Sequence, residues 1–433
     1  MTKTQIEAYI EAHREEIIAD IIQLIRFRST NGQKSETQAC LEFFLNRARE
    51  FGFRTMSTSS GDVGIVEMGQ GDETIGILVH LDVVEIGDID KWTNDPFDCV
   101  QRDGFLWGRG AQDDKGAAIM SLYAMKAVKE LNLPMHRKVW LIAGTSEEVV
   151  WTDIASFKCE FPQPDFGFSP DGQFPIYNIE MGYADLQLNF MRDGNRGIRM
   201  LQSGENPNTI PSKAMIELKD GRSIISHGIS SHSSMPEEGD NAIIKLCADL
   251  KSEAGVDFDF VNFVNRFCHN DGSQLDLRID NGIDTLDGEF IGLTTVSPTM
   301  LQLEEESVRL TVNIRHKYGT SREQVMDAFL KHAGEFGFTL STFDYLEPMR
   351  VSSKLPFLTV MREVSEEFGL EGKFCLARGT SYAKSMDNFV SWGPVFPGDP
   401  ETAHIEDERI SVSTVLLATK LYARFIERMV GDD

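Results

Sequence analysis

The stretch Ile75–His80, with the sequence IGILVH, is a short apolar run that ends on a histidine. Such a run is typical of a strand buried on both faces of a sheet. Downstream, Gly116–Leu131 carries apolar residues at helical spacing, and Lys138–Gly144 is a second buried run. Strand, helix and strand in this order predict a parallel sheet with helices on its faces.

The pattern continues at both ends of the chain. Helical spacing marks four further segments: Ile6–Phe27, Glu36–Phe51, Leu355–Phe368 and Val412–Met429. From about Tyr183 to Tyr345 the sequence instead alternates apolar and polar residues and includes helical stretches. We therefore predict a two-domain α/β protein. Its first domain has a mixed, mostly parallel sheet built from residues 1–182 and 346–433, and an α+β domain, residues 183–345, is inserted into it.

Charge and composition exclude several partners. With 68 acidic and 42 basic residues the net charge is −26, which would repel nucleic acid and anionic membranes. No apolar run approaches the roughly 20 residues that span a bilayer. The polar, acidic start does not fit a signal peptide, so we expect a cytoplasmic location. The six cysteines contain no C-x-x-C pair, which predicts neither a thiolate metal cluster nor a disulfide framework.

Two motifs place acids beside a predicted strand end or helix start. In His80-Leu81-Asp82 the carboxylate lies two residues from the imidazole, so both point to one side of a strand and Asp82 can orient His80. The alternative is a surface loop. In the glycine-rich loop Gly108–Gly116, Asp113 and Asp114 precede a helix. Adjacent aspartates there are commonly only a helix cap, yet one carboxylate could bridge two cations.

Three more motifs follow strands or turns. Glu147 and Glu148 end a strand, so one could bind metal while the other faces the substrate as a base; an exposed acidic turn is the alternative. Ser169–Gly172 and Ala403–Glu408 could each be a plain turn. Together the motifs give five nitrogen and oxygen ligands without sulfur, a set that suits paired zinc, manganese or cobalt: His80, Asp113, Glu148, Asp171 and His404.

In this order the motifs resemble the zinc metallopeptidase family of carboxypeptidase G, aminoacylase, succinyl-diaminopimelate desuccinylase and dipeptidase V. The phrases Leu106–Gly110, Phe168–Pro175 and Phe396–Gly398 are most similar to the dipeptidase V branch. The resemblance implies a cis peptide bond after Asp113. It also assigns Glu147 as general base and acid.

The resemblance further implies two divalent cations, expected to be zinc, with manganese or cobalt as alternatives. One would lie on His80, Asp113 and Asp171. The other would lie on Asp113, Glu148 and His404.

The inserted domain has its own matches. His232 resembles a lid histidine that polarises the scissile carbonyl, and Asn208 lies in a similar lid motif. Arg315 and the backbone near Gly379 match groups that hold the substrate carboxylate. Arg378 stands where glycine is usual. The resemblance thus implies a lid domain that closes on the substrate.

The function expected on these grounds is hydrolysis of the amide bond of dipeptides by a water that two metals activate. An N-acyl amino acid amidohydrolase is the alternative enzyme, and a non-catalytic peptide-binding protein is the alternative of another class. The expected partner is a small peptide, with a monomer favoured over a homodimer because the inserted segment is long. Side-chain preference and pathway stay open.

Overall fold

The computed structural model describes residues 3–191, 195–254, 256–274 and 276–431. The chain forms two compact units. The first comprises Met1–Asn178, Val351–Cys375 and Ser381–Asp433, and the second comprises Ile179–Arg350 and Leu376–Thr380. No pattern in the sequence predicted that Leu376–Thr380 belongs with the second unit. Among the described residues, no helix has the length and apolar character needed to cross a membrane.

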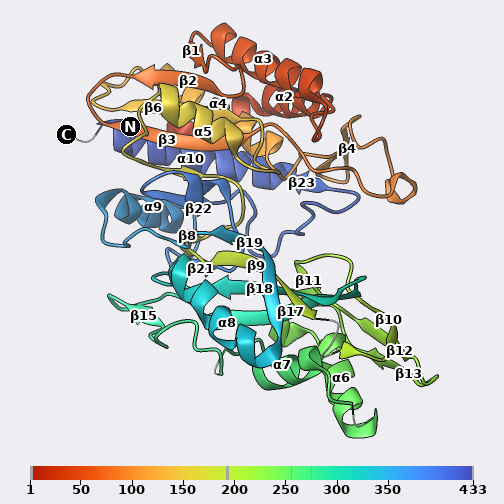
Figure 1. Cartoon of the computed structure of the whole chain (residues 1–433). Helices are drawn as coiled ribbons and strands as arrows, with labels where there is room; N and C mark the ends of the chain where they lie inside the picture. The colour runs from red at the N-terminus through yellow and green to blue at the C-terminus, as the bar shows by residue number, and fades with distance from the viewer. Residues whose placement is uncertain (1–2, 192–194, 255, 275, 432–433) are drawn as a thin grey trace. The chain divides into compact units, whose positions relative to one another are not determined.

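A nine-stranded mixed sheet organises the first unit, to which all of its strands belong except β20 (Met349–Arg350) and the ends of β8 and β21 (Figure 1). Its strand order is β1-β2-β6-β3-β7-β22-β8-β20, and β21 also pairs with β8. The four central strands run parallel, whereas the outer pairs are antiparallel. The strands are β1 (Arg54–Ser57), β2 (Gly64–Gly69), β3 (Thr74–His80), β6 (Lys138–Gly144), β7 (Phe166–Ser169), β8 (Ile176–Glu180), β20 (Met349–Arg350), β21 (Phe374–Ala377) and β22 (Phe389–Trp392).

Within the described part of the chain, seven α-helices accompany this sheet: α1 (Lys3–Ala12), α2 (Arg14–Ile25), α3 (Lys34–Glu50), α4 (Lys115–Glu130), α5 (Thr152–Glu160), α9 (Pro356–Glu367) and α10 (Val412–Gly431). Helix α4 is buried along most of its length because it packs against both β3 and α10. The single helix predicted over Ile6–Phe27 is wrong. The chain breaks at His13, which leaves helical geometry with a ψ of 11° and whose ring stacks on Tyr9.

Parallel pairing in the centre of the sheet positions the functional loops. Strand β3 pairs with β6 so that His80 lies opposite Gly144, and with β7 so that Ile77 lies opposite Phe168. The carboxyl ends of parallel strands meet at one edge of a sheet, where ligands commonly bind. His80 and the loops that follow Gly144 and Ser169 therefore come together at this edge.

The second unit is built on a seven-stranded antiparallel sheet in the order β13-β12-β10-β17-β18-β9-β19. The strands are β9 (Gly182–Met191), β10 (Ile198–Ser203), β12 (Lys213–Leu218), β13 (Ser223–His227), β17 (Thr295–Leu303), β18 (Ser307–His316) and β19 (Phe338–Leu346). Alternate residues of β9 are buried, which matches its alternating sequence.

Three helices pack on this sheet and on one another: α6 (Ala242–Asp249), α7 (Asp259–Phe267) and α8 (Arg322–Phe336) (Figure 1). Phe263 of α7 lies at the centre of an aromatic core that includes Phe190 and Phe336. The mixed sheet with its helices and the antiparallel sheet with its helices are thus both present. The predicted fold class, an α/β protein with a mixed sheet and a separate α+β part, is confirmed.

Candidate metal centre

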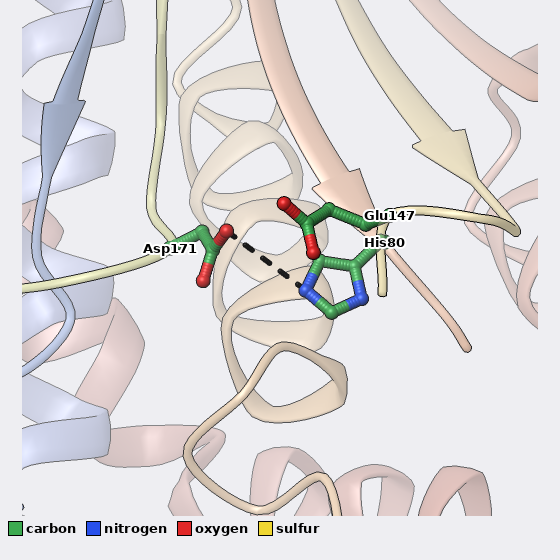
Figure 2. Close-up of side chains that lie close together, drawn as sticks. All are labelled: His80, Glu147 and Asp171. Carbon is green, nitrogen blue, oxygen red and sulfur yellow. Dashed lines mark ion pairs between the residues drawn. The ribbon is translucent and has the colours of Figure 1, made fainter. Parts of the chain in front are cut away.

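Three of the predicted site residues converge at the carboxyl edge of the parallel strands (Figure 2). His80 ends β3, Glu147 follows β6 and Asp171 follows β7. His80 Nε2 lies 3.9 Å from Asp171 Oδ2. Ligand atoms of His80, Glu147 and Asp171 all lie within 4.8 Å of one another, and the same holds for His80, Asp113 and Glu148. The edge therefore gathers two overlapping groups of metal-type ligands.

Asp113 lies between two histidines. Its Oδ1 is 2.9 Å from His80 Nε2, and its Oδ2 is 2.9 Å from His404 Nε2. His404 Nε2 is also 3.1 Å from Glu148 Oε1. Ligand atoms that share one zinc at about 2 Å each stand about 3.3 Å apart in tetrahedral geometry. The spacings are close to this value, and the two oxygens of Asp113 face two separate ligand groups.

The tautomer of His80 shows what the cluster lacks. Nδ1 of His80 donates a hydrogen bond to the backbone oxygen of Asp82 at 3.0 Å, because a carbonyl oxygen can only accept. In the neutral ring Nε2 then carries a lone pair, which faces Asp113 Oδ1. Both atoms are buried and, among the described residues, neither has a hydrogen-bond partner. Two electron-rich atoms in contact need either a proton or a metal ion between them, and a buried imidazole nitrogen facing a carboxylate oxygen is a ligand pair that fits a bound metal.

The pKa values of the clustered side chains also fit a bound metal. Burial, with a contribution from the charge of Asp113, raises the pKa of Asp171 to about 7. Burial and the charge of Asp171 raise the pKa of Glu147 well above its usual range. The hydrogen bonds with Asp113 and Glu148 raise the pKa of His404 to about 11. Without metal these groups must take up protons to limit repulsion, whereas divalent cations would stabilise the charged carboxylates.

Asp82 acts on the turn that carries the two glutamates. Its Oδ1 accepts a hydrogen bond from the Glu147 backbone amide at 3.2 Å, and its Oδ2 accepts one from the Glu148 amide at 3.1 Å. Asp82 Oδ1 also lies 3.5 Å from His80 Nδ1, although the ring nitrogen bonds the Asp82 backbone instead. The carboxylate therefore links the end of β3 to the start of the Glu147-Glu148 turn.

A buried brace, which the motifs did not predict, joins the Asp113 loop to the His404 loop. The Glu408 carboxylate is fully buried, and Arg109 donates a hydrogen bond to it at 2.7 Å. Glu408 also accepts hydrogen bonds from the backbone amides of Gly110, Gln112 and Asp113 at 3.0, 2.8 and 3.1 Å. The sequence held one hint of this contact. The backbone amides of the glycine-rich loop need acceptors, and Glu408 lies only four residues after His404.

Gln112 completes this brace from the opposite loop. Its side-chain oxygen accepts hydrogen bonds from the amides of Thr402 and Ala403 at 2.8 and 2.9 Å, and its side-chain nitrogen donates to Pro400 O at 3.0 Å. His404 follows with a φ of 64°, a left-handed conformation that non-glycine residues rarely adopt. The brace thus holds His404 in an unusual backbone geometry.

A second unforeseen group supports the Glu147 turn. Asp153 accepts hydrogen bonds from the backbone amide of Thr145, at 2.6 Å, and from that of Ser146, at 3.1 Å. Tyr382 donates its hydroxyl to the same carboxylate, and its ring lies edge-on to the ring of His80 with centroids 6.1 Å apart. The peptide bond between Asp113 and Asp114 is cis, as the resemblance implies.

The remaining predicted residues lie in the second unit. Two short strands, β11 (Thr209–Ile210) and β14 (Ser231–His232), pair with Thr209 opposite His232, and Asn208 O accepts a hydrogen bond from the Ser233 amide. Arg315 is buried and donates from Nη1 to the backbone oxygen of Arg378 at 3.4 Å, next to the exposed Gly379. The structure therefore places His232 beside the Asn208 segment, and Arg315 beside the Arg378-Gly379 segment.

A cluster of imidazole and carboxylate ligands at the carboxyl edge of a parallel sheet is the arrangement that a metal-dependent hydrolase needs. Residues 76–428 match Peptidase family M20/M25/M40, and the chain belongs to this family. It is 31% identical to Putative dipeptidase YtjP of Bacillus subtilis (strain 168), over 97% of this chain and 98% of that one.

Other comparisons agree with this assignment. The chain is 27% identical to Beta-Ala-Xaa dipeptidase of Lactobacillus delbrueckii subsp. lactis, over 98% of both chains. In fold it is similar to human carnosine dipeptidase 1, with a TM-score of 0.65, 15% identity and coverage of 99% of both chains. The family inferred from the sequence motifs is confirmed.

Proposed function

We propose that this chain is a metal-dependent dipeptidase that hydrolyses the amide bond of dipeptides. The observation that carries the proposal is the Asp113 carboxylate, which lies 2.9 Å from Nε2 of both His80 and His404 in a member of a peptidase family. The substrate class is supported by two relatives that match nearly the whole chain and are named dipeptidases.

In this proposal Asp113 would be a ligand of both of two divalent cations. His80 and Asp171 complete one site, and Glu148 and His404 complete the other. Three contacts support this division: the two oxygens of Asp113 lie 2.9 Å from Nε2 of His80 and of His404, and Glu148 Oε1 lies 3.1 Å from His404 Nε2. When bound, a zinc pair would supply a water whose pKa falls from about 15.7 towards about 7, together with positive charge for the carbonyl oxygen.

Glu147 is the proposed general base and acid. Its carboxylate takes a proton from the attacking water and returns it to the nitrogen of the leaving amine. One feature supports this role for Glu147 rather than Glu148. Glu148 Oε1 contacts His404, whereas no hydrogen bond or ion pair of the described residues ties down the Glu147 carboxylate. The Asp82 carboxylate also fixes the backbone of the turn that carries both glutamates.

The second unit contributes the proposed substrate contacts. Arg315 and the backbone at Gly379 hold the substrate's C-terminal carboxylate, since a guanidinium pairs with a carboxylate through two hydrogen bonds. His232 donates to the oxygen of the scissile carbonyl, and Asn208, its neighbour across β11 and β14, assists. We propose that this unit is the lid domain and that the inserted segment, residues 183–345, forms most of it.

Three finer points complete the proposal. The native metal is zinc, because the ligands are imidazole and carboxylate groups. The location is the cytoplasm, in keeping with six cysteines that are all free of disulfides. The chain acts as a monomer, which the length of the inserted segment supports.

A substrate panel tests the proposal. Purified protein would be assayed with added zinc, manganese or cobalt against dipeptides, tripeptides and N-acetylated amino acids. Dipeptides with a free N-terminus should be cleaved with the highest kcat/KM. A higher kcat/KM for the N-acetylated amino acids would contradict the proposal and indicate an N-acyl amino acid amidohydrolase.

A further inference from the structure

The ring of His232 is held by the residue two positions further along the chain. Its Nδ1 lies 2.6 Å from the Ser234 hydroxyl and accepts a hydrogen bond from the Ser234 backbone amide at 3.2 Å. The Met235 amide donates to the His232 carbonyl at 2.9 Å, which closes a tight turn around the ring. The side chain of His232 is exposed, while Ser234 is buried.

These contacts determine the tautomer. A backbone amide can only donate, so Nδ1 must be the acceptor and the proton of a neutral ring resides on Nε2. Partial loss of solvent around the ring and the positive charge of Arg315 lower the pKa of His232, which favours the neutral ring. His232 therefore presents one N–H donor on the side away from Ser234.

Arg378 connects this turn to the proposed carboxylate anchor. Its Nη1 donates to the Ser234 backbone oxygen at 3.1 Å and forms an ion pair with Glu237. Its own backbone oxygen accepts the hydrogen bond from Arg315. One residue thus links Arg315, Gly379 and the turn that holds His232. The hydrogen bond to Ser234 and the ion pair with Glu237 both need the Arg378 side chain, and glycine, which is usual at this position in the family, could form neither.

We propose that Ser234 and Arg378 are positioning residues that present His232 as an Nε2–H donor and couple this donor to the carboxylate anchor. The role of the donor rests on the proposed function, because a dipeptide supplies both the carbonyl oxygen and the carboxylate. Binding of the carboxylate at Arg315 and Gly379 orders Arg378, and Arg378 in turn orders the Ser234 turn.

The tautomer can be measured without activity. Long-range ¹H–¹⁵N correlation spectra of ¹⁵N-histidine-labelled protein distinguish protonated from unprotonated ring nitrogens, and His232→Gln assigns the signal. We expect an unprotonated Nδ1 and a protonated Nε2 in the wild type. Ser234→Ala keeps the backbone amide and loses only the hydroxyl, so the proton should stay mainly on Nε2 while the two ¹⁵N shifts move partly towards each other, and Ser234→Thr should restore them. A protonated Nδ1 in the wild type would overturn the proposal, as would unchanged shifts in Ser234→Ala.

Kinetics test the coupling. Loss of one neutral hydrogen bond is worth about 0.5–1.5 kcal/mol, so Ser234→Ala should lower kcat for a dipeptide about 2- to 12-fold with little change in KM. Arg378→Ala should lower kcat by a similar factor for a dipeptide and less for its C-terminal amide. Arg266→Ala is the matched control, since Arg266 forms a similarly exposed ion pair with Glu335 in the same unit.

The outcomes separate the two proposals. Equal effects of Arg378→Ala on a dipeptide and on its amide would overturn the coupling. If Arg378→Ala fails to fold, Glu237→Gln tests the same link by removing the charge that holds the guanidinium. If the wild type cleaves no dipeptide, the proposed function fails, while the ¹⁵N spectra still decide whether Ser234 positions His232.

Discussion

The ligand cluster of the first unit and the His232 turn of the second are held by opposite means. In the first unit the supporting groups are charged and buried: Glu408 and Arg109 have side-chain exposures of 0% and 1%. In the second unit the comparable ion pair, Arg378 with Glu237, has both side chains 44% exposed. Exposed pairs contribute little to stability, whereas breaking a buried pair leaves an uncompensated charge.

This difference separates two kinds of function. A metal centre needs ligands fixed in space before the metal arrives, so its support is dense and buried. A group that donates to a transient oxyanion needs the correct tautomer and direction but little charge. We therefore expect changes around Asp113 to alter metal binding, and changes around His232 to alter turnover while metal binding stays intact.

The largest effect should follow from Glu147→Gln. The amide cannot move the proton, so kcat should fall about 10²- to 10⁴-fold. Bound metal, measured by elemental analysis, should stay at the wild-type level, whereas Glu148→Ala should lose metal. Glu130→Gln, at the exposed end of α4, serves as the control for loss of one negative charge. Loss of metal in Glu147→Gln would make Glu147 a ligand, consistent with its position near His80 and Asp171.

Arg315→Ala tests the carboxylate anchor of the second unit. A hydrogen bond to a charged group is worth about 1.5–3 kcal/mol, so kcat/KM for a dipeptide should fall about 10- to 150-fold. The C-terminally amidated dipeptide should lose far less, because it never makes the contact. Arg309→Ala on the same strand, β18, is the matched control. An equal loss for both substrates would show that Arg315 does not bind the carboxylate.

Glu408→Ala tests the buried brace of the first unit. Changes in the groups that orient metal ligands typically weaken metal binding about 10- to 100-fold. We expect a weakening in this range in a competition titration with a chromophoric chelator, and a smaller one in Glu408→Gln, which keeps an acceptor for the backbone amides. Glu406→Ala, in the same loop with its carboxylate on Asp88, is the control. Unchanged metal affinity in Glu408→Ala would show that the brace does not position the metal ligands.

The sequence predicted those parts of the molecule that depend on local pattern. Lys138–Gly144 forms a strand at the predicted bounds, and the helix predicted over Val412–Met429 is α10, because periodicity acts over neighbouring residues. The motifs also named the acids and histidines that converge at the sheet edge. Contacts between residues far apart in the chain could not be predicted in this way. Glu408 and the amides of the Asp113 loop meet only after folding, and so do Arg378 and Ser234.

The division of labour between Glu147, Glu148 and Asp171 stays a prediction, because all three carboxylates lie around the same histidine. Sequence spacing orders such residues along the chain, but the order of proton and metal binding depends on distances of a few tenths of an ångström. The Glu147 and Glu148 variants should therefore be measured side by side, because only the difference between them separates the base from the metal ligand.

Metal titration of metal-free protein tests the central claim most directly. Protein stripped with a strong chelator would be titrated with zinc while bound metal and dipeptide hydrolysis are followed in the same samples. We predict no hydrolysis without metal, and hydrolysis that rises until two zinc ions are bound per chain. Full hydrolysis in the metal-free protein, or saturation of both binding and hydrolysis at one ion per chain, would contradict the shared role of Asp113.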